Sequence, residues 1–182
     1  MAEYYLISQL PSLDGAWENN PLPITDERFL ELCSRILGGK ELEELENLTI
    51  VPPIDANNTN SALIEAWCDG ERDLRLALSK VRADKMNKPI NLGNKNLSSE
   101  IVKVANSALE MNPLEAEIFL LNHRLNFLES IRPLDGFSTE FLFYYGLKLK
   151  LILRLKKFDA NIGETTYKDI YNSILNGENL EA

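Results

Sequence analysis

Apolar positions recur at helical spacing along most of the chain, and the clearest case runs from Ser61 to about Met86. At 100° per residue, its apolar residues fall within about a third of the helix circumference. That stripe consists of Leu63, Ala66, Trp67, Gly70, Leu74, Ala77, Leu78 and Val81. The pattern predicts one continuous amphipathic helix. Gly70 is expected on its buried side, where the missing side chain permits close packing.

Two other helices have well-marked starts. Thr25, followed by two acids, predicts an N-cap, and the helix after it should end at Gly38-Gly39. Asn112-Pro113 supplies a cap and a proline at the first helical position of a helix that runs toward Ile131. This second helix has two apolar stripes and is therefore expected to be central and buried on two sides.

The segment from Ser138 to Asp159 fits two periods. Its alternating leucines, Leu147 to Leu155, match the two-residue period of a strand. We favour a helix because the run is long, because Leu, Lys and Arg are good helix formers, and because Lys150, Arg154 and Lys157 share one narrow polar face.

Weaker patterns predict the remaining elements. Short helices are expected at Glu41–Leu48, around Ile101–Leu109 and at about Glu164–Leu175. The apolar run Tyr4–Leu10 is expected to be a strand or an extended entry segment. Val51-Pro52-Pro53 forces an extended loop.

These patterns predict an all-α protein, a bundle of about six to seven helices with a short extended N-terminal segment. We expect a single helical domain over residues 1–182, because this length buries about two-thirds of the surface that the unfolded chain exposes. The loop near residues 50–60 is the candidate joint between subdomains.

Composition narrows the class of function. Hydrophobic residues make up 45% and charged residues 26%, as in ordinary globular proteins. The formal charge of −9 argues against a nucleic-acid role, which needs clustered Lys and Arg. No stretch reaches the apolar length of a membrane helix, so direct membrane insertion is not expected.

The two cysteines, Cys33 and Cys68, lie in unrelated segments and form neither a metal-type pair nor a disulfide framework. Each is expected to be a small buried apolar residue in a reducing compartment. The N-terminal residues show no secretion signal, so we expect a cytoplasmic protein.

The sequence has few residues or motifs that are typical of catalysis, metal binding or nucleotide binding. His123 is the sole histidine, so a two-histidine metal site is impossible and any His-dependent triad would use this residue. Its place on an apolar stripe favours a hydrogen-bonded core or interface histidine over a catalytic one. The sequence has no phosphate loop, nucleophile elbow or dinucleotide motif. We therefore expect no catalytic residue, no metal, no cofactor and no small-molecule ligand.

Charged and aromatic clusters have ordinary explanations. The acids of Glu41–Glu46 lack the spacing of a calcium loop and are expected to be solvated. A basic set alternates with acids and favours pairing within the helix, with an acidic partner surface as the alternative. That set is Arg72, Arg75, Lys80, Arg82 and Lys85. Aromatics around Phe141–Tyr145 favour core packing, with an interface anchor as the alternative.

Three segments carry a family resemblance: AEYYLISQLPSL, AWCDGERDLRLALSKVRADK and FYYGLKLKLILRLKKFD. Together they resemble an uncharacterised bacterial family encoded beside V-type ATPase genes, which is similar to the C subunit of that enzyme. Residues 71–76 and 145–150 look like two degenerate copies of a motif of those subunits, which implies two pseudo-repeated helical subdomains. Full C subunits are substantially longer than this chain.

The resemblance implies a non-catalytic, all-helical stalk part that couples the central rotor to the membrane ring without nucleotide or metal. Our leading hypothesis is therefore an accessory or C-like subunit of a prokaryotic V-type ATPase. Its expected partners are stalk or ring subunits, which would place it at the cytoplasmic face of the inner membrane. The alternatives are a free-standing helical adaptor or assembly factor, and an enzyme with a polar site around His123, Arg124 or Arg132.

Overall fold

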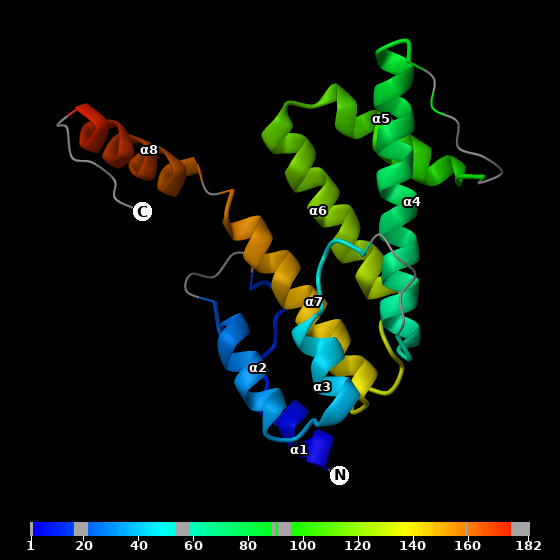
Figure 1. Cartoon of the computed structure of the whole chain (residues 1–182), viewed down its shortest axis with the longest axis vertical. Coiled ribbons are helices and arrows are strands. Elements are labelled where there is room, and N and C mark those ends of the chain that lie inside the picture. The colour runs from blue at the N-terminus through cyan, green and yellow to red at the C-terminus, as the bar shows by residue number, and fades with distance from the viewer. Residues whose placement is uncertain are drawn as a thin grey trace.

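A computed structural model describes residues 2–16, 22–53, 59–88, 90, 96–158 and 160–175. Within these ranges the protein is all-helical, with eight helices and no strand, which confirms the predicted fold class (Figure 1). The helices are α1 (Ala2–Gln9), α2 (Asp26–Ser34), α3 (Gly39–Glu46), α4 (Ala62–Lys85), α5 (Ser99–Glu110), α6 (Pro113–Ser130), α7 (Thr139–Lys156) and α8 (Ala160–Leu175).

The helix starts lie where the capping residues predict them. Side chains of five N-cap residues accept a hydrogen bond from the backbone N–H three positions later, which satisfies one of the unpaired donors of the first turn. These residues are Thr25, Ser61, Ser98, Asn112 and Ser138. The long segment after Ser138 is a helix, so its leucines follow the helical and not the two-residue period.

The prediction of an extended N-terminal segment is wrong, because Ala2–Gln9 is a helix. Leu6 and Ile7 are buried against the body, whereas Tyr4 and Tyr5 are exposed. A run this short contains too few apolar positions to separate a period of two from one of 3.6. Burial of one side against the other helices decides its structure.

Helix α7 lies at the centre of the molecule and contacts α2, α3, α4 and α6. Its residues from Leu142 to Leu149 are all buried, as are Leu151 and Ile152. At Gly146 an added Cβ would lie 3.1 Å from Leu48 and 3.2 Å from Phe29. The missing side chain therefore lets the segments around α2 and α3 approach α7 closely.

Two hydrophobic cores form on either side of the middle of the body. The main core gathers α1, α2, α3 and α7 with the first half of α4 and the second half of α6. A smaller core joins the second half of α4 with α5 and the first half of α6. Leu121 and Leu128 belong to the main core and Leu120 to the smaller one, which confirms the two-sided burial predicted for α6.

The ring of Phe127 on α6 packs directly against Gly70 of α4. A Cβ at this position would lie 2.4 Å from the ring of Phe127, so a larger residue could not take this place unless the ring moved. The predicted role of Gly70 in close packing is therefore confirmed. The predicted joint near residues 50–60 falls between α3 and α4, and residues 54–58 of it lie outside the described ranges.

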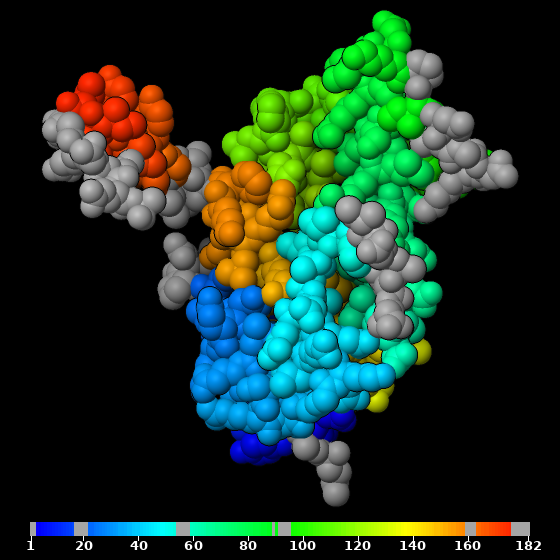
Figure 2. Space-filling model, viewed as in Figure 1, coloured from blue at the N-terminus to red at the C-terminus, as the bar shows by residue number. Residues whose placement is uncertain are grey.

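Helix α8 lies apart from the other seven (Figure 1), and the space-filling view shows it projecting from the body (Figure 2). From Gly163 to Leu175 every residue except Ser173 is exposed. None of the described helices combines the length and apolar character required to cross a bilayer.

Candidate functional site

A buried ion pair joins α4 to α6 at the boundary between the two cores. The Glu71 carboxylate accepts hydrogen bonds from Arg124 Nε at 2.8 Å and from Arg124 Nη2 at 2.9 Å. Only 1% of the Glu71 side chain and 9% of the Arg124 side chain are exposed. Two parallel bonds of this kind fix the guanidinium plane as well as its distance.

Arg75 completes this site from one turn further along α4. Its Nε donates to Glu71 Oε1 at 2.8 Å, so one carboxylate holds two guanidinium groups. The side chain of Arg75 is about half exposed. Two guanidinium groups against one carboxylate give this site a net positive charge, although the protein is acidic overall.

A cavity of about 480 Å³ opens on one side of this pair. Glu71 and Arg124 line it together with Gly70, Phe127 and His123, and its remaining lining is Leu74, Ser98, Glu100, Ile101, Asn126 and Ser130. Its size lies in the range of small-molecule sites, and its walls combine apolar surface with a few polar groups. We call it the histidine cavity.

His123 is half-buried in that cavity, where it makes no hydrogen bond with the part of the chain that the structure describes. The hydrogen bond predicted for a core histidine is therefore not seen among the described residues, and the interface alternative stays a prediction. Burial and the nearby Arg124 charge lower the pKa of His123, so its ring is neutral at neutral pH. No described partner orients the ring as a general base requires.

Of the residues named for the alternative polar site, His123, Arg124 or Arg132, the structure brings only the first two together. His123 and Arg124 line the histidine cavity, but Arg132 lines a different hollow with Tyr144 and Lys148. There the Arg132 guanidinium lies 5.7 Å from the centre of the Phe141 ring and 5.5 Å from that of Tyr144, as a cation over aromatic faces.

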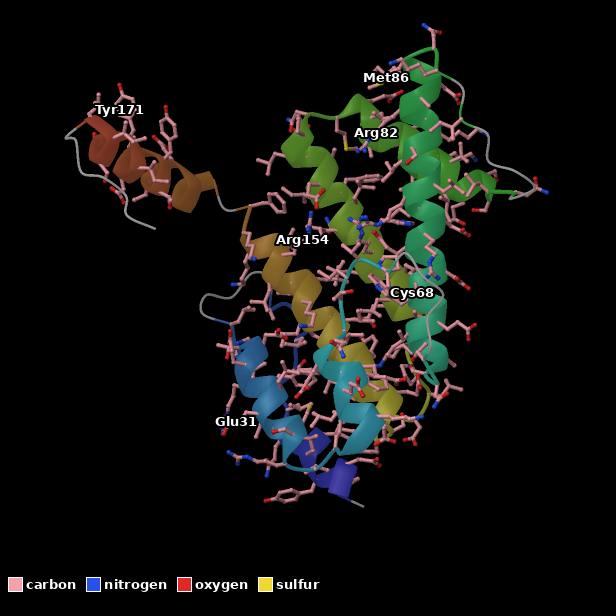
Figure 3. The ribbon with its side chains drawn as sticks, in the orientation of Figure 1. Glu31, Cys68, Arg82, Met86, Arg154 and Tyr171 are labelled. Atoms are coloured by element: carbon pink, nitrogen blue, oxygen red, sulfur yellow. The ribbon has the colours of Figure 1, made fainter. Side chains whose placement is uncertain are left out.

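A second cavity, of about 300 Å³, opens on another side of Arg124. Four guanidinium groups line it, from α4 (Arg75 and Arg82), α6 (Arg124) and α7 (Arg154). The other lining residues are Ile50, Val51, Leu78, Ser79, Glu117 and Leu120. Arg82 and Arg154 are labelled in Figure 3, which shows them on two different helices. We call this the arginine cavity.

The basic set of α4 follows the predicted pairing only in part. Arg72 contacts Asp69 at 3.2 Å, and Arg75 bonds to Glu71, both within the helix. The side chain of Arg82 makes no ion pair or hydrogen bond with any described residue and lines the arginine cavity instead.

Lys148 is a buried cation, a role that the sequence patterns do not reveal. Its Nζ donates to Asp14 at 2.8 Å and to Glu129 at 2.6 Å, and it thereby ties the loop after α1 and the end of α6 to α7. Burial alone would lower the pKa of Lys148, but these two carboxylates outweigh it and raise the pKa. Lys148 therefore remains charged over the physiological range.

Both cysteines are buried, as predicted. Burial raises the pKa of the Cys33 thiol to about 12, so it stays protonated and unreactive. Among the described residues, no group of three or more His, Cys, Asp or Glu side chains lies close enough to hold a metal ion.

Exposed apolar side chains gather at two places far apart on the molecule. On α8 they form one stripe, which we call the α8 face: Tyr167, Ile170, Tyr171, Ile174 and Leu175. At the other place, Tyr4 of α1 contacts Phe137 at 4.5 Å between ring centres, and the exposed Leu134 lies in the same α6–α7 turn as Phe137. We call this second set the aromatic patch.

One signal in the sequence marks the buried ion pair. Glu71 lies among Trp67, Gly70 and Leu74 on the apolar stripe of α4. Arg124 similarly lies between Leu120 or Leu121 and Leu128 on α6. Opposite charges on two apolar stripes indicate a buried pair, because neither charge is stable there alone.

Comparison with protein-family models, curated proteins and solved structures finds no match.

Proposed function

We propose that this chain is a non-catalytic accessory or C-like subunit of a prokaryotic V-type ATPase. In this role it links the central stalk to the membrane ring by protein–protein contacts, at the cytoplasmic face of the inner membrane. The proposal combines the family resemblance of three segments with the exposed apolar surfaces of the fold.

The α8 face is the observation that carries this proposal. Five large apolar side chains lie on one side of a helix and are exposed to solvent. Tyr167 and Tyr171 stack with ring centres 6.1 Å apart, so the face presents an ordered aromatic pair. An amphipathic helix of this kind binds by laying its apolar side into a groove of another protein.

The aromatic patch supplies the second contact that a linking subunit needs. In Figure 1, α1 lies at the lower end of the body and α8 lies beyond its upper left. Aromatic side chains are enriched among residues that dominate interface affinity. Two apolar surfaces at separate ends fit a protein that bridges two partners.

Co-purification from the native cell tests the proposal. The tagged chain is expected to retain stalk or ring subunits of the ATPase. Ile174→Asp places a charge in the α8 face and should abolish this retention. Asn172→Asp adds the same charge to the same helix outside the face and should leave retention unchanged.

Two results would contradict the proposal. Recovery of no stalk or ring subunit would remove the ATPase assignment, and a stable complex with an unrelated protein would favour the free-standing adaptor. Equal retention by the two variants would exclude the α8 face as the contact.

A further inference from the structure

The arginine cavity concentrates positive charge that the described residues only partly neutralise. Four guanidinium groups line it, and the carboxylates bonded to them are Glu71 and Glu117. This leaves an excess of two positive charges in a chain whose formal charge is −9. Like charges brought together in a hollow repel one another unless an anion enters.

The two carboxylates hold three of the four arginines without using all their donors. Glu71 takes Nε and Nη2 of Arg124 and Nε of Arg75. Glu117 Oε1 takes Nε and Nη2 of Arg154, at 2.8 and 2.6 Å. Each guanidinium has five N–H donors, so at least one nitrogen of each arginine remains for a ligand.

Arg124 is the fixed element of this set. Its side chain is nine-tenths buried and lines the cavity from α6 while its bonds to Glu71 hold the guanidinium plane. Arg82 completes the set from α4 with no described bonding partner of its own. Donors fixed in advance bind an anion at a smaller entropic cost than mobile surface lysines do.

The remaining walls suit an organic group attached to the anion. Ile50, Val51, Leu78 and Leu120 supply apolar surface, and Ser79 adds a hydroxyl. A volume of about 300 Å³ lies at the small end of the range for ligand sites.

We infer that the arginine cavity binds a small phosphorylated molecule, with its phosphate on the arginines of α4, α6 and α7 and its organic part on the apolar wall. A phosphate dianion matches the excess of two positive charges. Its three terminal oxygens accept guanidinium donors that converge from three helices, whereas a flat carboxylate offers only two oxygens. This inference is independent of the ATPase proposal.

Calorimetric titration of the full chain at low salt tests it with three probes: phenyl phosphate, inorganic phosphate and benzoate. Phenyl phosphate is expected to bind at millimolar concentration or below. Inorganic phosphate should bind more weakly because it lacks the apolar group, and benzoate should bind more weakly because it lacks the third oxygen and the second charge. Failure of phenyl phosphate to bind, or equal binding of benzoate, would overturn the assignment.

Arg82→Gln is the decisive variant, since Arg82 has no described ion pair whose loss could unfold the protein. We expect it to weaken phenyl phosphate binding by about tenfold. Lys85→Gln removes the same charge from the same helix outside the cavity lining and should change affinity little. Arg82→Lys keeps the charge but loses the paired donors of the guanidinium. Its affinity for phenyl phosphate should lie between those of the wild type and Arg82→Gln. Equal effects of Arg82→Gln and Lys85→Gln would show unspecific attraction and contradict the site.

Discussion

Helices α7 and α8 follow one another in the chain and have similar lengths, 18 and 16 residues, yet their surroundings are opposite. Helix α7 is surrounded by other helices, and even its Lys148 is buried. Helix α8 leaves its tyrosines and isoleucines in solvent.

The difference separates residues that maintain the fold from residues available to a partner. The apolar side chains of α7 lose their contact with water when the chain folds, so they contribute to stability. The apolar side chains of the α8 face lose contact with water only if another molecule covers them. We therefore expect them to contribute to the free energy of binding. Substitutions in α7 should therefore lower the stability of the fold, whereas substitutions in the α8 face should weaken the binding of a partner.

The largest loss of stability is expected for Leu149→Ala in α7. Leu149 is completely buried, so the substitution leaves a cavity in the main core and should cost about 4 kcal/mol of unfolding free energy. Urea unfolding followed by circular dichroism measures this cost. A change below about 1 kcal/mol would show that the main core is loosely packed at this point.

Arg124→Met is expected to cost roughly 3 kcal/mol, because it leaves the Glu71 carboxylate buried with only Arg75 as partner. The control is the double variant Glu71→Leu/Arg124→Met, which removes both charges and should recover most of the loss. Equal stability of the single and double variants would mean that the buried carboxylate is not the source of the cost.

Lys148→Met should cost about 1 kcal/mol at neutral pH, a small value because Asp14 and Glu129 remain partly accessible to water. The effect should depend on pH. The hydrogen bond from Lys148 lowers the pKa of Asp14. Burial alone would raise the pKa of Glu129, but hydrogen bonds from Lys148 and Tyr144 lower it overall.

For both carboxyl groups the stabilising contribution is therefore complete above their ordinary pKa of about 4 and disappears as pH falls through the lowered values. Thermal unfolding between neutral and strongly acidic pH should show the wild type approaching Lys148→Met as the pH falls. A difference that stays constant with pH would exclude the ion pairs as its cause.

The smallest effect on stability is expected for Ile170→Ala in α8, within about 0.5 kcal/mol, because Ile170 is exposed. The same unfolding measurement as for Leu149→Ala checks it. A loss comparable to that of Leu149→Ala would show that α8 packs on the body in solution and would remove the distinction between the two helices.

Local signals predicted the helices well. Thr25, Ser61, Asn112 and Ser138 each precede an apolar period, and each caps a helix in the structure. Helix α1 was predicted wrongly because Tyr4 and Tyr5 favour strands and the run is short. Burial of Leu6 and Ile7 against distant parts of the chain decides its structure, and no local pattern contains that contact.

The cavities were beyond local prediction for a related reason. Arg82, Arg124 and Arg154 are far apart in the sequence and meet only when three helices pack. The charges of Glu71 and Arg124 on apolar stripes could have indicated a pair, but neither helix alone identifies the partner of its charge. Periodicity describes one helix at a time, whereas a site depends on several.

Helix α4 passes from one core into the other without a break. At 1.5 Å per residue, its 24 residues form a rod of about 36 Å. The ion pair between Glu71 and Arg124 connects α4 to α6 near the middle of α4. Because α4 is one continuous helix that contributes to both cores, we expect a displacement at one end of it to reach the other core.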